Sequence, residues 1–240
     1  MGYVIYNENT PQVRGVLFDM DGVVLDTEVL YTRFWMEACH FYGYPMTREQ
    51  ALGMRSLGAA DGERNLRRWF GPEVNYHAVR AKRIELMEDY IEKEGVIPKP
   101  GARELLEYLR QRGIRTAIAT SSPIERANAH LGSVGLDVLF DEICSGRQVA
   151  NPKPAPDIYR YAAQKLGLKP EECLAIEDSP TGLESAYRAG CWPVMVPDQD
   201  QPDENTLKLL FAKADSLTDV MKWMGRCPLQ MRTTVQQTVL

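Results

Sequence analysis

The sequence predicts an α/β fold, with a doubly wound, mostly parallel sheet covered by helices on both faces. Short apolar runs rich in β-branched residues alternate with segments of helical periodicity through the second half of the chain. Several of these runs end directly in polar groups, at the strand ends where the chemistry of parallel sheets gathers. A long stretch of helical patterns lies between the first apolar run and the rest, so a helical segment is expected to interrupt the sheet.

In the first half, the run RGVLF at residues 14–18 predicts a strand buried on both faces. Residues 28–43 place apolar side chains at helical spacing, and Gly43 suits the end of a helix. Residues 72–94 predict a long amphipathic helix that ends near Gly95. We expect the stretch between these two helices to be helical with loop breaks.

The segment VIPKPG, at residues 96–101, predicts a linker that returns the chain from one unit to another. Farther on, Ser122, Pro123 and Glu125 predict a helix start, with Ser122 as the cap. The other elements expected after the linker are, in chain order, a helix at 102–112, a strand at 114–120, a strand at 138–144, a helix at 156–166, a strand at 172–178, a helix at 182–189 and a strand at 191–196.

Composition narrows the class of protein. The chain has 240 residues, of which 44% are hydrophobic and 25% charged, so disorder and collagen-like repeats are excluded. A net charge of −5 makes nucleic-acid binding a minor alternative. We see neither a run of about 20 apolar residues nor a signal peptide. Five scattered cysteines without a CxxC pair indicate reduced thiols, and we expect a cytoplasmic protein without membrane partners, monomeric or alternatively homodimeric.

Polar side chains end or follow the predicted strands. In a parallel sheet they would meet at one edge, around one pocket. They are Asp19 and Asp21 after the first strand, Thr120, Ser121 and Ser122 after the second, Lys153 in the loop after the third, and Glu177 and Asp178 at the end of the fourth.

This set of groups predicts a magnesium site that holds a phosphate ester. Two carboxylates about 4 Å apart repel by roughly 4 kcal/mol at an effective dielectric near 20, so a cation is expected between them. Oxygen ligands without His or Cys suit Mg²⁺. Asp19 could attack phosphorus to form an aspartyl-phosphate, and Asp21 could serve as acid and base. Thr120 and Lys153 would then hold phosphate oxygens.

Four strings in this order, FDMDGVVLDTE, ATSSP, KPAPDIY and IEDSPTGLESAYRAG, resemble the motifs of the haloacid dehalogenase superfamily, specifically its β-phosphoglucomutase-like, subfamily I phosphatases. The resemblance implies a Rossmann-like core, residues 1–27 and 96–240, and an inserted small α-helical cap domain, residues 28–95.

The resemblance also implies a role for each site residue. Asp19 would be the nucleophile and a Mg²⁺ ligand, and Asp21 the acid and base, with its backbone carbonyl on the metal. Asp178 would bind Mg²⁺ directly and Glu177 through water. The remaining expected roles are phosphate binding by Thr120 and Lys153, and substrate contacts by Ser121, Ser122 and the cap residue Arg55, which lies in the string GMRS.

Two alternatives to a phosphatase of a small phosphorylated metabolite, such as a sugar phosphate, stay open. A phosphosugar mutase of the same family would carry a His where this chain has Tyr31, and Lys and Asn where it has Pro123 and Ile124. A non-catalytic, phosphoryl-accepting regulator would need neither the acid Asp21 nor a cap. The departures from the mutase pattern, and the presence of Asp21 and of a cap, both favour the phosphatase.

Overall fold

The computed structural model describes residues 2–5, 12–55, 57–199 and 201–226 of the 240-residue chain. Within these ranges no helix is long and apolar enough to cross a membrane. The chain divides into two compact units, one formed by residues 1–25 and 98–240 and the other by residues 26–97. The first contains the sheet and the second is helical.

Within the described residues the sheet has seven strands in the order β1-β7-β6-β5-β2-β3-β4, and all neighbours are parallel except β1 and β7. From β2 at the centre the chain winds outward to β3 and β4, and then to β5, β6 and β7 on the other side, which confirms the predicted doubly wound α/β fold. The strands are β1 (Tyr3–Ile5), β2 (Gly15–Phe18), β3 (Arg115–Thr120), β4 (Glu142–Ser145), β5 (Cys173–Glu177), β6 (Trp192–Met195) and β7 (Ala212–Ala214).

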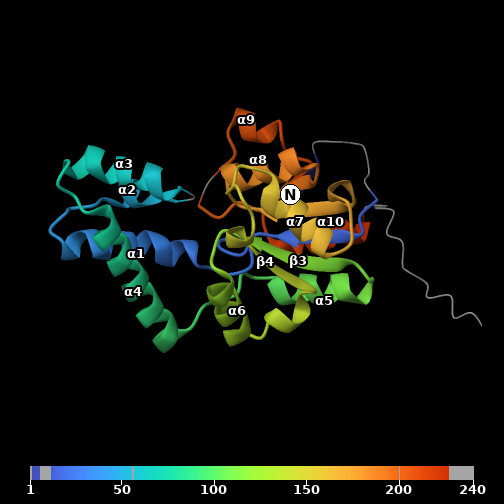
Figure 1. Cartoon of the computed structure of the whole chain (residues 1–240). Helices are drawn as coiled ribbons and strands as arrows, with labels where there is room; N and C mark the ends of the chain where they lie inside the picture. The colour runs from blue at the N-terminus through green and yellow to red at the C-terminus, as the bar shows by residue number, and fades with distance from the viewer. Residues whose placement is uncertain (1, 6–11, 56, 200, 227–240) are drawn as a thin grey trace, which may run out of the picture. The chain divides into compact units, whose positions relative to one another are not determined.

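Helices cover both faces of the sheet, with α5 and α6 on one side and α7 and α8 on the other (Figure 1). Apart from the exposed Arg115 at the start of β3, the residues of β2, β3 and β5 are buried between these layers, as expected for strands covered on both faces. The helices of this unit are α5 (Ala102–Gln111), α6 (Ile124–Ser133), α7 (Asp157–Lys165), α8 (Pro180–Ala189), α9 (Glu204–Leu207) and α10 (Leu217–Arg226), and its 3-10 turns are η1 (Asp137–Leu139), η2 (Gly146–Gln148) and η3 (Pro170–Glu172).

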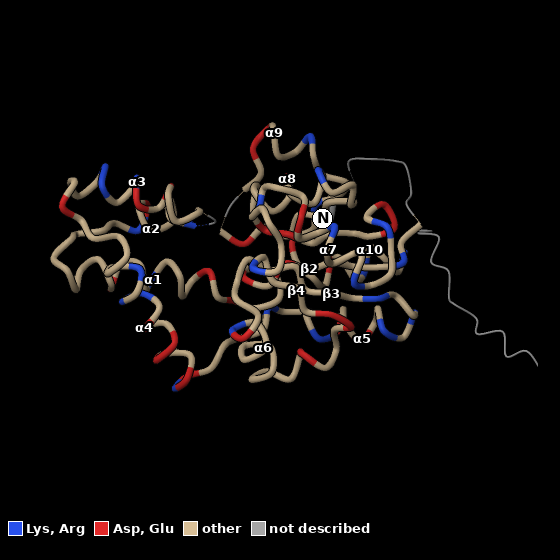
Figure 2. The backbone as a smooth tube through the Cα atoms, in the orientation of Figure 1, with Lys and Arg blue, Asp and Glu red and all other residues tan. Residues whose placement is uncertain are grey.

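The helical unit contains α1 (Glu28–Phe41), α2 (Arg48–Leu52), α3 (Ala59–Phe70) and α4 (Tyr76–Glu94). Its core forms around Trp35, which stacks on Tyr76 with ring centroids 6.1 Å apart. The predicted helix ends are close to those observed, because Gly43 and Gly95 follow α1 and α4 in backbone conformations with positive φ. Acidic and basic residues are interspersed along α3 and α4 (Figure 2).

One sequence-based expectation about the elements was wrong, and one pair of strands was not predicted. Residues 138–140 do not extend a strand: η1 and the residue after it occupy them, and β4 begins at Glu142. The edge pair of β1 and β7 was not predicted, since each strand has three residues and no clear period.

Candidate active site

Asp19 and Asp21 lie just beyond the carboxyl end of β2, the central strand. The backbone N–H of Asp19 donates to the carbonyl of Ile176 at 2.9 Å, which continues the pairing with β5 and holds Asp19 at the sheet edge. Met20 between the two aspartates is fully buried. Gly22 then turns the chain with φ of 84°, a left-handed conformation that glycine adopts without steric cost.

Ser122 connects the end of β3 to Asp21. Its hydroxyl donates to Asp21 Oδ2 at 3.0 Å, and its backbone N–H donates to Thr120 Oγ1 at 3.0 Å. The expectation that Ser122 caps the next helix was therefore wrong. Pro123 occupies the cap position of α6 and no side chain caps that helix. Ser122 is 7% exposed and its hydroxyl positions Asp21, while a substrate contact of Ser122 stays a prediction.

Lys153 bridges two carboxylates from different strands. Its ammonium Nζ lies 2.5 Å from Asp19 Oδ1 and 2.6 Å from Glu177 Oε1. Burial alone would lower the pKa of Lys153, but the charges of Asp19 and Glu177 outweigh it and raise that pKa above its ordinary value. Lys153 is therefore a fixed positive charge at neutral pH.

Both oxygens of the fully buried Glu177 carboxylate accept hydrogen bonds from the protein. Oε1 accepts from Lys153 and from the hydroxyl of Tyr159, which lies at 2.6 Å, and Oε2 accepts from the Ser179 hydroxyl at 3.2 Å. The Ser179 Oγ in turn accepts from the backbone N–H of Gly182, at the start of α8. A Cβ atom at Gly182 would overlap the Glu177 carboxylate, so glycine is required there for the close approach of helix and strand end.

Asp19, Glu177 and Asp178 form a group of buried carboxylates that suits a divalent cation. One oxygen from each lies within 4.8 Å of the others. Burial raises the pKa of Asp19 from 3.8 to about 7, with Lys153 opposing and the charges of Glu177 and Asp21 adding to the rise. The candidate ligands in this group are all carboxylate oxygens, without His or Cys, which fits Mg²⁺. Both Glu177 oxygens accept hydrogen bonds from the protein, and direct Mg²⁺ binding by Asp19 and Asp178 stays a prediction.

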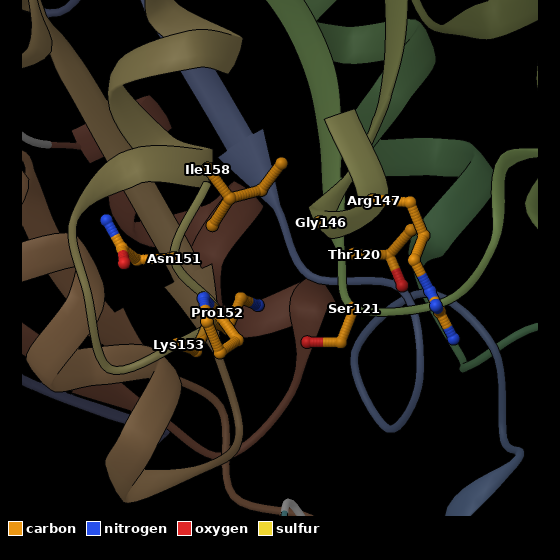
Figure 3. Close-up of a pocket in the computed structure, with 8 residues that line it drawn as sticks. All are labelled: Thr120, Ser121, Gly146, Arg147, Asn151, Pro152, Lys153 and Ile158. Atoms are coloured by element: carbon orange, nitrogen blue, oxygen red, sulfur yellow. The ribbon is translucent and has the colours of Figure 1, made fainter. Parts of the chain in front are cut away.

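A pocket of about 230 Å³ opens beside this cluster (Figure 3). Thr120 and Lys153 both line it, as does the exposed Ser121, so three of the residues expected to bind phosphate or substrate share one cavity. The complete lining is Thr120, Ser121, Gly146, Arg147, Asn151, Pro152, Lys153 and Ile158.

The expected cap residues belong to the helical unit. Arg55 follows α2, and its Nε donates to the carbonyl of Leu52 at 3.1 Å. Tyr31 lies on α1, where the guanidinium of Arg83 stacks over its ring at 4.8 Å. A substrate contact of Arg55 stays a prediction.

Sequence reasoning missed several residues of the site. Tyr159 lies in the predicted helix at 156–166 and within the string KPAPDIY, but no role was predicted for it. Ser179 precedes Pro180, a pattern typical of a helix cap, and this signal was available. Ser145 at the end of β4 carried no signal, because its hydrogen bond to the Ser122 carbonyl depends on the tertiary structure.

Comparison with known proteins places the chain among hydrolases. The family model of haloacid dehalogenase-like hydrolases matches residues 13–190. A phosphorylated carbohydrates phosphatase of Thermotoga maritima is 33% identical over 74% of this chain and 82% of its own length. Hexitol phosphatase A of Escherichia coli is 32% identical over 85% of this chain and 93% of its own length. The structure of CbbY from Rhodobacter sphaeroides in complex with phosphate has a TM-score of 0.72 at 27% identity, over 87% of this chain and 96% of that one.

Proposed function

The chain belongs to the haloacid dehalogenase-like hydrolase family and is a phosphoric monoester hydrolase, and we propose that it hydrolyses a small phosphorylated sugar through an aspartyl-phosphate, with Mg²⁺ as cofactor. The relatives named as phosphatases of carbohydrates and hexitols support the substrate class. The cytoplasm is the compartment we propose, because the four described cysteines are all free thiols.

The observation that carries the proposal is the bridge from Lys153 to Asp19 and Glu177. Burying this cluster of one ammonium and two carboxylates costs hydration free energy, and a buried cluster of charged groups beside a pocket is typical of a functional site. Lys153 also lines the pocket, together with Thr120. A phosphoryl group in that pocket would therefore meet a fixed positive charge next to the carboxylate proposed to attack it.

Each side chain has a proposed role. Asp19 attacks phosphorus while the Asp21 carboxyl gives its proton to the leaving oxygen, and Asp21 later takes a proton from the water that hydrolyses the aspartyl-phosphate. Ser122 orients Asp21 through the hydrogen bond to Oδ2. Lys153 neutralises negative charge on the phosphoryl oxygens, and Thr120 holds one of these oxygens. Mg²⁺, held by Asp19, Asp178 and the backbone carbonyl of Asp21, would supply further charge neutralisation.

The test is phosphate release from a panel of hexitol phosphates and hexose 1-phosphates, with Mg²⁺ or excess chelator. We expect turnover that needs Mg²⁺ and is abolished in Asp19→Asn, together with a phosphate adduct on the Asp19 peptide after rapid quenching of the wild type. Asp137→Asn is the matched control, since Asp137 lies before the amino end of β4, whereas the site lies at the carboxyl ends of the strands.

Three outcomes would overturn the proposal. Persistent turnover in purified Asp19→Asn would remove the nucleophile assignment. Isomerised sugar without phosphate release would indicate a mutase. Stable phosphorylation without turnover on any ester would indicate a regulator.

A further inference from the structure

The pocket beside the candidate site carries two cationic side chains and no carboxylate among its lining residues. Lys153 is already matched by Asp19 and Glu177. Arg147 is exposed, and across the described residues no hydrogen bond or ion pair engages its guanidinium. The pocket therefore has one more positive charge than its protein partners neutralise.

The backbone of Arg147 is held firmly against the end of β3. The Ser145 hydroxyl accepts from the Arg147 backbone N–H at 3.2 Å and donates to the Ser122 carbonyl at 2.6 Å. Ser145 is fully buried, and its own N–H donates to the Gln148 side chain at 2.8 Å, which closes the η2 turn. The Ser145 hydroxyl thus connects the backbone of Arg147 to Ser122, whose own hydroxyl donates to Asp21.

The close packing of Gly146 brings this turn to the pocket. A Cβ at Gly146 would lie 3.5 Å from Ser121 Cα and from the Thr120 carbonyl oxygen, so the turn lies directly on the end of β3. Figure 3 shows Arg147 on the Thr120 side of the pocket, with Lys153 and Asn151 on the other side. The two cations therefore come from opposite walls of one cavity.

From this arrangement we propose that Arg147 binds a second anionic group of the substrate, a carboxylate or a second phosphate, remote from the phosphoryl group that is transferred. The inference rests on the proposed phosphatase function and narrows its substrate class to esters with two anionic groups. A guanidinium suits this task because it is always charged and its planar donors pair with two oxygens of one anion. Arg147 is a specificity residue in this scheme, and it takes no part in the chemical step.

The test compares substrates that differ in the second charge. In the first pair, 6-phosphogluconate has a carboxylate where glucitol 6-phosphate has a hydroxymethyl group. In the second pair, fructose 1,6-bisphosphate has a second phosphate that fructose 6-phosphate lacks. We expect the wild type to prefer the charged member of at least one pair. Arg147→Gln should lower kcat/KM for that member about tenfold, mainly through KM, and change the neutral member by less than about threefold. Arg147→Glu should invert the preference.

Arg110→Gln removes the same charge near the end of α5, which leads into the amino end of β3, opposite the carboxyl ends of the strands that carry the site, and should change activity on neither substrate. The pair that responds tells whether carboxylate or phosphate is bound. An equal loss on both members of each pair would overturn the inference, since Arg147 would then serve the transferred phosphate or the fold. Equal kcat/KM of the wild type for the charged and neutral members of both pairs would also overturn the inference. Absence of turnover on every ester would instead refute the proposed phosphatase function.

Discussion

Gly182→Ala tests whether the Glu177 hydrogen bonds are as rigid as their geometry indicates. The added Cβ would overlap the Glu177 carboxylate from the start of α8. A long side chain can often move away from such a clash, but Glu177 is fully buried and its oxygens accept from Lys153, Tyr159 and Ser179. Any movement that makes room for the methyl group therefore breaks at least one of these hydrogen bonds.

The expected loss of stability follows from three contributions. Overpacking in a tight interior costs about 1–3 kcal/mol. Each hydrogen bond to a charged group contributes about 1.5–3 kcal/mol. Alanine in place of glycine in a helix returns about 1 kcal/mol. With one hydrogen bond lost, we expect the free energy of unfolding of Gly182→Ala to fall by about 1.5–5 kcal/mol.

The assay is urea unfolding followed by circular dichroism, with Gly132→Ala as the matched control. Gly132 also lies in a helix, α6, but the nearest atoms to its added Cβ are 3.9 Å away on Asp137. That variant should be unchanged or up to about 1 kcal/mol more stable. If Gly182→Ala were within about 0.5 kcal/mol of the wild type, the scale of an ordinary surface substitution, the close approach would not constrain the fold.

Three further predictions concern the same site and the buried thiols. Tyr159→Phe removes the hydroxyl that donates to Glu177, so the free energy of unfolding should fall by about 1–3 kcal/mol in urea unfolding, and an unchanged value would contradict the hydrogen bond at 2.6 Å. Mg²⁺ at about 100 times its dissociation constant should stabilise the wild type by about 2.7 kcal/mol, and Asp178→Asn should abolish the corresponding rise in Tm, whereas an equal rise would exclude Asp178 as a ligand. Burial raises the pKa of Cys39 to about 12, while an unfolded thiol titrates near about 8.5, so the unfolded chain loses its proton first and the free energy of unfolding should fall as pH rises from about 8.5 towards 12. Cys39→Ala should lessen that fall between pH values of about 8 and 10, and an identical pH dependence in both proteins would contradict the prediction.

Local patterns of the sequence were enough to predict the core of the fold. The strands at β2, β3 and β5 are continuous apolar runs, and such runs indicate burial on both faces whatever lies around them. The polar residues that follow these runs could be assigned to one sheet edge because parallel strands end on the same side. For Thr120 and Lys153 that assignment leads to one pocket, and for Asp19 and Asp178 to one carboxylate cluster.

Elements without a strong local period could not be predicted. The edge strand β1 and its neighbour β7 have three residues each, and they pair although they lie far apart in the sequence. The apolar residues before β4 have strand-like composition, yet Asp137 begins a 3-10 turn there. Short runs of this kind take the conformation that their surroundings impose.

The sequence by itself determined which chemical groups the protein brings to its sheet edge, since residue types and their order relative to the strands are local properties. Only the tertiary structure decided which group each of them contacts. Ser122 could have capped a helix and instead holds Asp21, and Glu177 could have faced a metal directly but accepts from Tyr159 and Ser179. A hydroxyl has a single proton to donate, and the partner that receives it depends on distances between segments far apart in the chain.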